Sequence, residues 1–254
     1  MTLAQRLLRV PFPYGTEIRV IRGPAKGMRF ILEPGIGVSY ALGTHAAAPR
    51  FFAKWLRPGA TVYDVGSNKG QMALIFAALV GPSGRVLAFE PAPHEYESLA
   101  RNIRINRLNN VRVFDAAAGE RRGEFAFAYS REQPTAGKFV SVGERYVSKG
   151  ADRFSVVAIP LDEVLAEEPA PDLIKIDVEG AAASVLAGAR RIIEQGSPII
   201  YVELHTAEEQ AGIRNHLLDN GYIARTLSGD VVRDPDSSWS SPLWCSRPDA
   251  SVEA

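Results

Sequence analysis

The chain has one cysteine, no long apolar run and no excess of either charge, and each of these scarcities excludes a class of site or partner. Its one cysteine, Cys245, excludes an internal disulfide and a cysteine-based zinc site. Its longest uninterrupted apolar run, Met72 to Val80, is well short of the roughly 20 residues that cross a bilayer. Lys and Arg together number 29, and Asp and Glu also number 29, so no excess charge indicates a nucleic-acid partner. We therefore expect a soluble, cytoplasmic protein that has no membrane span and does not bind nucleic acid.

The length of 254 residues allows one large domain with an extension. Arg6 and Arg9 alternate with leucines near the N-terminus, which predicts a short amphipathic helix that docks on the protein rather than on a membrane. Pro58 and Gly59 mark the entry to the main domain. The predicted divisions are an extension over 1–58, a main domain over 59–247 and a tail over 248–254.

The extension also carries the pattern of a β-hairpin. Glu17–Ile21 and Met28–Leu32 are rich in apolar residues, and the short segment between them begins and ends with glycine. A helix is predicted to follow over 49–56. These elements would precede the main domain.

From Ala60 onward the hydrophobic pattern alternates between strand and helix, which predicts a mainly parallel sheet covered on both faces. Residues 125–129 and 154–159 are predicted as further strands around a polar loop, 130–150, which is either a lid over the substrate or a poorly ordered insertion. The strands predicted for the main sheet are 61–63, 85–89, 111–114, 173–176, 199–204, 222–227 and 242–246. The predicted helices are 71–80, one from residue 93, one after Gly180 that reaches Ile193, and 207–220.

A glycine-rich turn over 64–70 joins the strand at 61–63 to the helix at 71–80. Glycine lets backbone N–H groups approach a ligand that a side chain would block. Glu90 ends the next strand, where a carboxylate can accept hydrogen bonds from the two hydroxyls of a ribose. The turn and Glu90 together predict a pocket for a cofactor that contains adenosine.

The spacing of the glycines distinguishes between two such cofactors. The dinucleotide fingerprint requires glycine at relative positions 1, 3 and 6, and counting from Gly66 the last two positions are Asn68 and Gln71. Asp64 would repel a pyrophosphate, but it suits the ammonium group of S-adenosylmethionine. The pattern therefore favours S-adenosylmethionine, and an NAD-dependent oxidoreductase remains the alternative.

Four segments, 64–70, 88–91, 173–180 and 202–205, occur in an order that resembles the FkbM family of S-adenosylmethionine-dependent methyltransferases. The resemblance runs from about Gly59 to His205. It implies a class I methyltransferase fold, which is a Rossmann-like α/β fold with a mostly parallel seven-stranded sheet flanked by helices. It also implies that the last two strands form a hairpin with one antiparallel member. The usual reaction of the family is methyl transfer to a hydroxyl oxygen.

The resemblance places the donor at the carboxyl ends of the first strands. Asp64 and the turn are expected to bind the methionine part, and Glu90 the ribose. Asp115 follows the third strand, where class I enzymes contact adenine, although it can equally cap a turn. The residues predicted to bind the cofactor are Asp64, Gly66, Asn68, Gly70, Glu90, Asp115 and Ala116.

Two further strands end in polar residues that are candidates for catalysis. Asp177 and Glu179 follow one strand, and Glu203 and His205 end another. We predict that Asp177, Glu179 and His205 are catalytic, with His205 best matched to neutral pH as a general base. The carboxylates would alternatively coordinate a divalent cation such as Mg²⁺. A structural role for His205 is the other possibility, and Lys175 is expected to pair with one of the carboxylates.

The function expected from the sequence is O-methylation of a hydroxyl on a sugar, glycolipid or secondary metabolite. The partner is thus a small-molecule or glycan acceptor. The alternatives are an NAD-dependent oxidoreductase and a cofactor-binding module that has lost catalysis. The sequence has no signature for the acceptor itself or for the oligomeric state.

Overall fold

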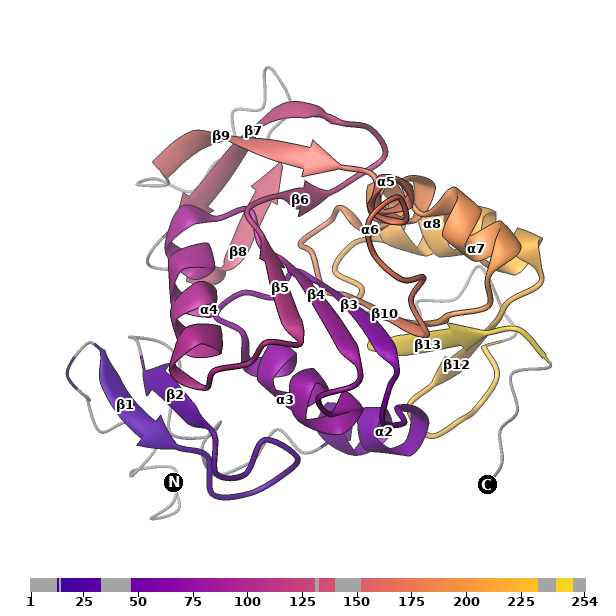
Figure 1. Ribbon diagram of the computed structural model, residues 1–254. Helices are drawn as coiled ribbons and strands as arrows, with labels where there is room; N and C mark the ends of the chain where they lie inside the picture. Colours follow the sequence, from indigo (N-terminus) through magenta and orange to yellow (C-terminus); the bar gives the residue numbers. More distant parts are fainter. Residues whose placement is uncertain are drawn as a thin grey trace, which may run out of the picture.

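The computed structural model describes residues 13, 15–32, 47–130, 133–139, 152–232 and 241–248. The expected helix near Arg6 and Arg9 and most of the expected tail lie outside these residues. The described part contains three sheets: a seven-stranded sheet flanked by helices, a four-stranded sheet and a two-stranded hairpin (Figure 1). None of the helices in these ranges is long and apolar enough to span a membrane.

The seven-stranded sheet has the order β12-β13-β11-β10-β3-β4-β5. β13 runs antiparallel to both of its neighbours, and all the other neighbours are parallel. This confirms the predicted class I methyltransferase sheet and its antiparallel hairpin strand. The strands are β3 (Thr61–Val65), β4 (Arg85–Phe89), β5 (Val111–Phe114), β10 (Leu173–Ile176), β11 (Ile199–Val202), β12 (Ile223–Thr226) and β13 (Leu243–Ser246).

Helices cover both faces of this sheet because its central strands are apolar on both sides (Figure 1). On one face, Phe52 of α2 packs against Phe76 of α3 and against Tyr201. On the other face, Leu186 of α6 and Ile213 of α8 belong to the largest apolar cluster. The helices are α2 (Ala47–Trp55), α3 (Gln71–Val80), α4 (Pro93–Ile105), α5 (Leu161–Val164), α6 (Ala182–Ala187), α7 (Arg190–Gln195) and α8 (Ala207–His216), with a 3-10 turn, η1 (Leu218–Asn220).

The structure has two helices, α6 and α7, where one helix is predicted from Gly180 to Ile193. The prediction of a single continuous helix is therefore wrong. The carboxylate of Asp162 accepts hydrogen bonds from the N–H groups of Arg191 and Ile192, at 2.8 and 3.0 Å. An acceptor from another element thus caps a new helix start, which the apolar spacing alone does not indicate. The helix predicted over 207–220 likewise changes at residue 217 into η1.

The segment between β5 and β10 builds the four-stranded sheet, in the order β6-β9-β7-β8. The predicted loop over 130–150 is corrected here, since Gln133–Phe139 forms strand β8 and pairs antiparallel with β7. This stretch lacks alternating apolar residues, so its strand structure depends on pairing with β7 rather than on its own pattern. The other strands are β6 (Ala117–Ala118), β7 (Gly123–Ser130) and β9 (Asp152–Ile159). The rest of the predicted loop, 140–150, lies outside the described residues.

The predicted N-terminal hairpin is confirmed as β1 (Thr16–Arg19) and β2 (Arg29–Leu32), which pair antiparallel. It attaches to α4 through two asparagine side chains. Asn102 Oδ1 accepts a hydrogen bond from the N–H of Ile31 at 2.9 Å, and Asn106 Oδ1 accepts one from the N–H of Arg29 at 2.7 Å. The hairpin is therefore held against a helix of the main sheet.

Candidate active site

The glycine-rich turn between β3 and α3 is closely packed at two positions. Gly66 and Gly70 have φ angles of 75° and 88°, which side chains rarely adopt. A Cβ atom on Gly66 would lie 1.9 Å from the carbonyl oxygen of Asp177, and one on Gly70 would lie 2.7 Å from Leu99 Cδ1. The turn therefore needs glycine at both positions, and its first glycine lies directly against the end of β10.

Glu90 follows β4 and is only 6% exposed. Its Oε2 accepts a hydrogen bond from the N–H of Asn68 at 2.8 Å, and its Oε1 accepts one from the N–H of Ala92 at 2.9 Å. Burial raises the pKa of Glu90 to about 7, although the two N–H groups act in the opposite direction. Each oxygen keeps a further lone pair, so this carboxylate can accept from two neighbouring hydroxyls.

Asp64 lies within β3, and its side chain is fully buried. Neither carboxylate oxygen accepts a hydrogen bond of normal geometry from the described residues, and Lys175 Nζ lies 3.4 Å from Oδ1. Burial raises the pKa of Asp64, and the ammonium of Lys175 opposes this. A buried carboxylate with unused lone pairs fits a second cation, such as the ammonium group of a methionine moiety.

Asp115 and Ala116 directly follow β5, at the same edge of the sheet as Glu90. The N–H of Glu90 donates to the carbonyl of Phe114 at 3.2 Å, so the two strand ends are adjacent. The side chain of Asp115 is exposed, whereas Ala116 is buried. The structure thus places both residues beside Glu90, and their contact with adenine stays a prediction.

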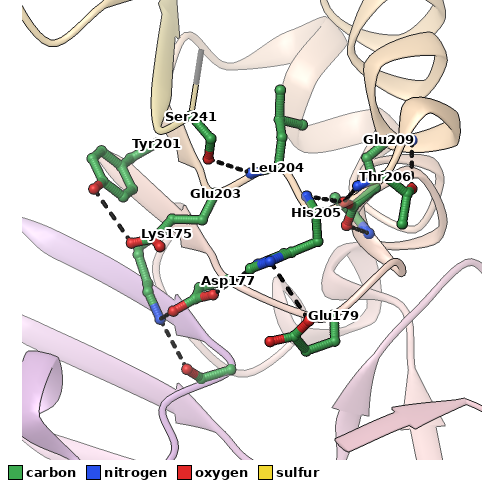
Figure 2. A network of polar contacts seen from close by, with 12 residues as sticks. Lys175, Asp177, Glu179, Tyr201, Glu203, Leu204, His205, Thr206, Glu209 and Ser241 are labelled. Carbon is green, nitrogen blue, oxygen red and sulfur yellow. Dashed lines mark hydrogen bonds and ion pairs between the residues drawn. The ribbon is translucent and has the colours of Figure 1, made fainter. Parts of the chain in front are cut away.

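His205 lies 28 residues after Asp177 in the sequence. Its side chain nevertheless forms one cluster with those of Asp177 and Glu179, as Figure 2 shows. β10 and β11 are neighbouring parallel strands, so the residues that follow them meet at one edge. His205 Nε2 lies 3.3 Å from Asp177 Oδ1, and His205 Nδ1 lies 3.5 Å from Glu179 Oε2. We call these three residues the acceptor cluster, after the role at the methyl acceptor that is predicted for them.

Both ring nitrogens of His205 face a carboxylate oxygen. A neutral imidazole has only one N–H, so this arrangement suits the doubly protonated imidazolium. The hydrogen bond to Asp177, together with the charge of Glu179, raises the pKa of His205 to about 9. The role of general base predicted from the sequence requires an ordinary histidine pKa, and the structure differs on this point. At neutral pH His205 carries a positive charge.

The two carboxylates of the acceptor cluster differ from each other. Burial would raise the pKa of Asp177, but Lys175 and His205 outweigh it and hold the pKa at about 2. Burial raises the pKa of Glu179 above its ordinary value. Of the two, Glu179 is therefore the better proton acceptor.

Lys175 lies on β10 and is 3% exposed. It donates a hydrogen bond to the carbonyl oxygen of Gly66 at 2.8 Å, and its Nζ lies 3.4 Å from Asp177 Oδ2 (Figure 2). The expected pairing with a carboxylate is confirmed, and Asp64 is a second partner.

Glu209, in the first turn of α8, was not singled out from the sequence. It is fully buried, and its Oε2 accepts hydrogen bonds from the N–H groups of His205 and Thr206 at 2.6 and 2.9 Å. Its Oε1 accepts from the N–H of Ala182 at 3.2 Å. The signal was present, because Thr206 and Glu209 have the spacing of a capping box, which the structure contains. Glu209 fixes the backbone that carries His205.

The predicted alternative of a divalent cation finds no support in this geometry. Within the described ranges, no three Asp, Glu, His or Cys side chains are arranged to hold a metal ion. Both nitrogens of His205 instead face carboxylates.

The sheet order, the antiparallel strand β13 and the glycine turn after β3 are those of the class I methyltransferase fold. The family profile described as Methyltransferase FkbM domain matches residues 64–224. The chain therefore belongs to the FkbM family of S-adenosylmethionine-dependent methyltransferases. This membership favours the methyl donor over the NAD-dependent alternative.

Two similar proteins support this assignment, and one solved structure supports the fold. The 31-O-demethyl-FK506 methyltransferase FkbM of Streptomyces tacrolimicus is 34% identical over 159 residues, which are 52% of this chain and 60% of that protein. Methyltransferase sdnD of Sordaria araneosa is 30% identical over 204 residues, or 68% of this chain and 74% of that protein. The crystal structure of an FkbM methyltransferase from Methylobacillus flagellatus KT matches with a TM-score of 0.51 at 20% identity, and the match covers 81% of this chain and 54% of that chain. The last similarity shows the fold alone, and the match to the Streptomyces protein leaves two fifths of that protein's length uncovered.

Proposed function

We propose that the protein transfers a methyl group from S-adenosylmethionine to a hydroxyl oxygen of a small molecule, such as a sugar, a glycolipid or a secondary metabolite. One observation carries this proposal. Gly66 of the donor turn approaches Asp177 of the acceptor cluster so closely that a Cβ would meet its carbonyl at 1.9 Å. A donor and an acceptor bound at these two places would therefore be neighbours, as in-line methyl transfer requires.

The donor residues have separate tasks in this proposal. The ammonium group of the donor binds the free lone pairs of Asp64, and the backbone of Gly66, Asn68 and Gly70 surrounds the methionine part. Glu90 accepts the ribose hydroxyls. Asp115 and Ala116 lie where the adenine would follow.

The acceptor cluster handles the proton of the hydroxyl. The methyl group moves from sulfur to oxygen, the sulfur keeps the electron pair of the broken bond, and the hydroxyl proton passes to a base. Glu179 is the group we assign as this base, because its pKa is raised and Asp177 is already bound by two cations. His205 would act as a base only after losing its own proton, and otherwise supports the charge of the two carboxylates.

Oxygen as the methylated atom has support from one relative. The Streptomyces protein is described as a methyltransferase of 31-O-demethyl-FK506, a name that places the methyl group on an oxygen. Since the match covers 60% of that protein, the acceptor of this chain is proposed only as a hydroxylated molecule.

Calorimetric titration with S-adenosylhomocysteine, and separately with NAD, tests the donor assignment. We expect micromolar binding of the first and none of the second. Absence of binding by S-adenosylhomocysteine would refute the donor site. A screen of hydroxylated acceptors with a labelled methyl donor then tests turnover, which the cofactor-binding module without catalysis would not show.

For an acceptor found in this way, Glu179→Gln should slow methylation by about 100-fold, with donor affinity unchanged. His205→Ala tests the other candidate base, and a rate within about a factor of two of the wild type would remove His205 from that role.

A further inference from the structure

Lys175 contacts both halves of the proposed site (Figure 2). On the donor side it donates to the carbonyl oxygen of Gly66 at 2.8 Å and lies 3.4 Å from Asp64 Oδ1. On the acceptor side it lies 3.4 Å from Asp177 Oδ2. One ammonium group therefore touches the donor turn, the donor carboxylate and the acceptor cluster.

The backbone register explains how one lysine reaches both sides. Lys175 stands opposite Asp64 in the parallel pair of β10 and β3, so both side chains project to the same face of the sheet. Asp177 is two residues further along the chain and extends beyond the end of β10. An ammonium between these two carboxylates can bind both at once.

Burial makes this arrangement more than a surface ion pair. The side chains of Lys175 and Asp64 are 4% and 0% exposed, so water screens their charges weakly. A pair that only neutralised Asp64 would need no second carboxylate. The second one, Asp177, is 35% exposed at its side chain and belongs to the acceptor cluster.

Asp177 is in turn shared between two cations. Its Oδ2 faces Lys175 and its Oδ1 faces His205. Charges of alternating sign thus run from Asp64 through Lys175, Asp177 and His205 to Glu179. Two further carboxylates act on this row of charges by electrostatic attraction. Glu203 acts on Lys175, and Glu209 acts on His205.

We propose that Lys175 is a positioning residue that couples the donor pocket to the acceptor cluster through the two carboxylates that it holds, Asp64 and Asp177. This inference rests on the proposed function, since it assigns the donor's ammonium group to Asp64. Binding of that group adds a positive charge beside Lys175. Asp64 then interacts with two cations, and its interaction with Lys175 weakens. Lys175 then interacts more strongly with Asp177, which holds the proton of His205 less tightly.

The first test follows the imidazole of His205 by NMR in the full chain during a titration to alkaline pH. The chain has four histidines, and the signal lost in His205→Gln identifies the right one. In Lys175→Met, the midpoint of His205 should rise by about half a pH unit, because Asp177 is no longer shared with a second cation. An unchanged midpoint, or a fall toward the ordinary histidine value, overturns the proposal.

Two further variants control this test. Lys54→Met removes an exposed lysine of α2 and the same net charge, and it should leave the midpoint unchanged. Lys175→Met leaves buried Asp64 without this cation and can fail to fold. The combination of Lys175→Met with Asp64→Asn removes both buried charges, and a smaller rise is expected in it because a negative charge is lost as well. A folded double variant without the rise also refutes the coupling.

The wild-type protein provides a second test that needs no variant. Saturating S-adenosylhomocysteine should lower the midpoint of His205 by about 0.3 pH unit. If calorimetry shows binding and the midpoint does not move, the coupling is refuted while the donor site stands. If no binding occurs, the proposed function fails, and the Lys175→Met titration still decides whether Lys175 shares Asp177 with His205.

Discussion

The side chain of Glu90 links the end of β4 to the glycine-rich turn after β3. Its two oxygens hold the N–H groups of Asn68 and Ala92, which fixes the carboxylate in one orientation. In the proposed donor site the remaining lone pairs are therefore preorganised for the ribose hydroxyls, with little entropy left to lose on binding.

Glu90→Gln should weaken S-adenosylhomocysteine binding by about tenfold or more. A charged acceptor forms stronger hydrogen bonds than a neutral amide, and the amide offers only one accepting oxygen. Calorimetry measures the change. Glu97→Gln, at an exposed position of α4, is the matched control and should leave the affinity unchanged.

The affinity for S-adenosylhomocysteine should also fall as the pH drops below about 7, because the pKa of Glu90 is raised to about 7 by burial. In the proposed donor site the ionised form accepts the ribose hydroxyls, so affinity should be full above this pKa and decrease by up to about tenfold per pH unit below it. For folding the sign is opposite, since the protonated form is favoured by burial and its stabilisation is lost as the pH rises from about 4.5 to about 7. Titrations at several pH values measure the effect. If the affinity of Glu90→Gln for S-adenosylhomocysteine fell equally with decreasing pH, the assignment of this effect to Glu90 would be contradicted.

At the scale of elements, the first turn of α8 positions the segment that follows β11. Thr206 caps the helix, and Glu209 accepts hydrogen bonds from the N–H groups of His205 and Thr206. Glu209 also binds the N–H of Ala182, at the start of α6. Two helices therefore hold the backbone at His205 in place.

Thr206→Ala should lower the free energy of unfolding by about 1 kcal/mol, which is typical for the loss of a helix cap. Urea unfolding measures this change. Thr206→Ser keeps the capping oxygen and serves as the control, with most of the stability retained. If Thr206→Ala were as stable as the wild type, the capping box would not hold this helix start in solution.

At the scale of the whole molecule, an ionic network links two strands of the main sheet, at the end opposite the proposed site, to the segment that follows α5. Glu168 accepts two hydrogen bonds from Arg85, both at 2.9 Å, and one from Arg112 at 2.8 Å. The hydrogen bonds from Arg85 hold the pKa of Glu168 below its ordinary value. Arg85 begins β4, so the network ties the strand starts to the chain after α5, away from the carboxyl ends that carry the proposed site.

Glu168→Ala should therefore reduce the free energy of unfolding by about 2 kcal/mol, through loss of charge-assisted hydrogen bonds. Donor affinity should not change. Glu167→Ala is the control, since the side chain of Glu167 is 70% exposed and its pair with Arg112 contributes less than about 0.5 kcal/mol. Chemical denaturation and calorimetry measure the two effects separately, and a loss of donor affinity in Glu168→Ala would contradict this separation.

Elements that depend on local pattern were predictable from the sequence. The helix at 71–80 and the strands at 85–89, 111–114 and 173–176 agree with the structure at every boundary. Where the predictions failed, at the break between α6 and α7 and at β8, a partner distant in the chain or pairing with another strand decides the structure. The division into an extension, a main domain and a tail stays a prediction.

The sequence by itself determined the glycine turn, Glu90, and the strand ends that carry Asp177 and His205, because each depends on short-range spacing. Only the tertiary structure decided the charges in the site. Lys175 bonds to Gly66 across 109 residues of chain, and His205 faces Asp177 across 28. Charge states depend on burial and on neighbours brought together by the fold, so no local pattern could indicate that His205 is held as a cation and that Lys175 lies between two carboxylates.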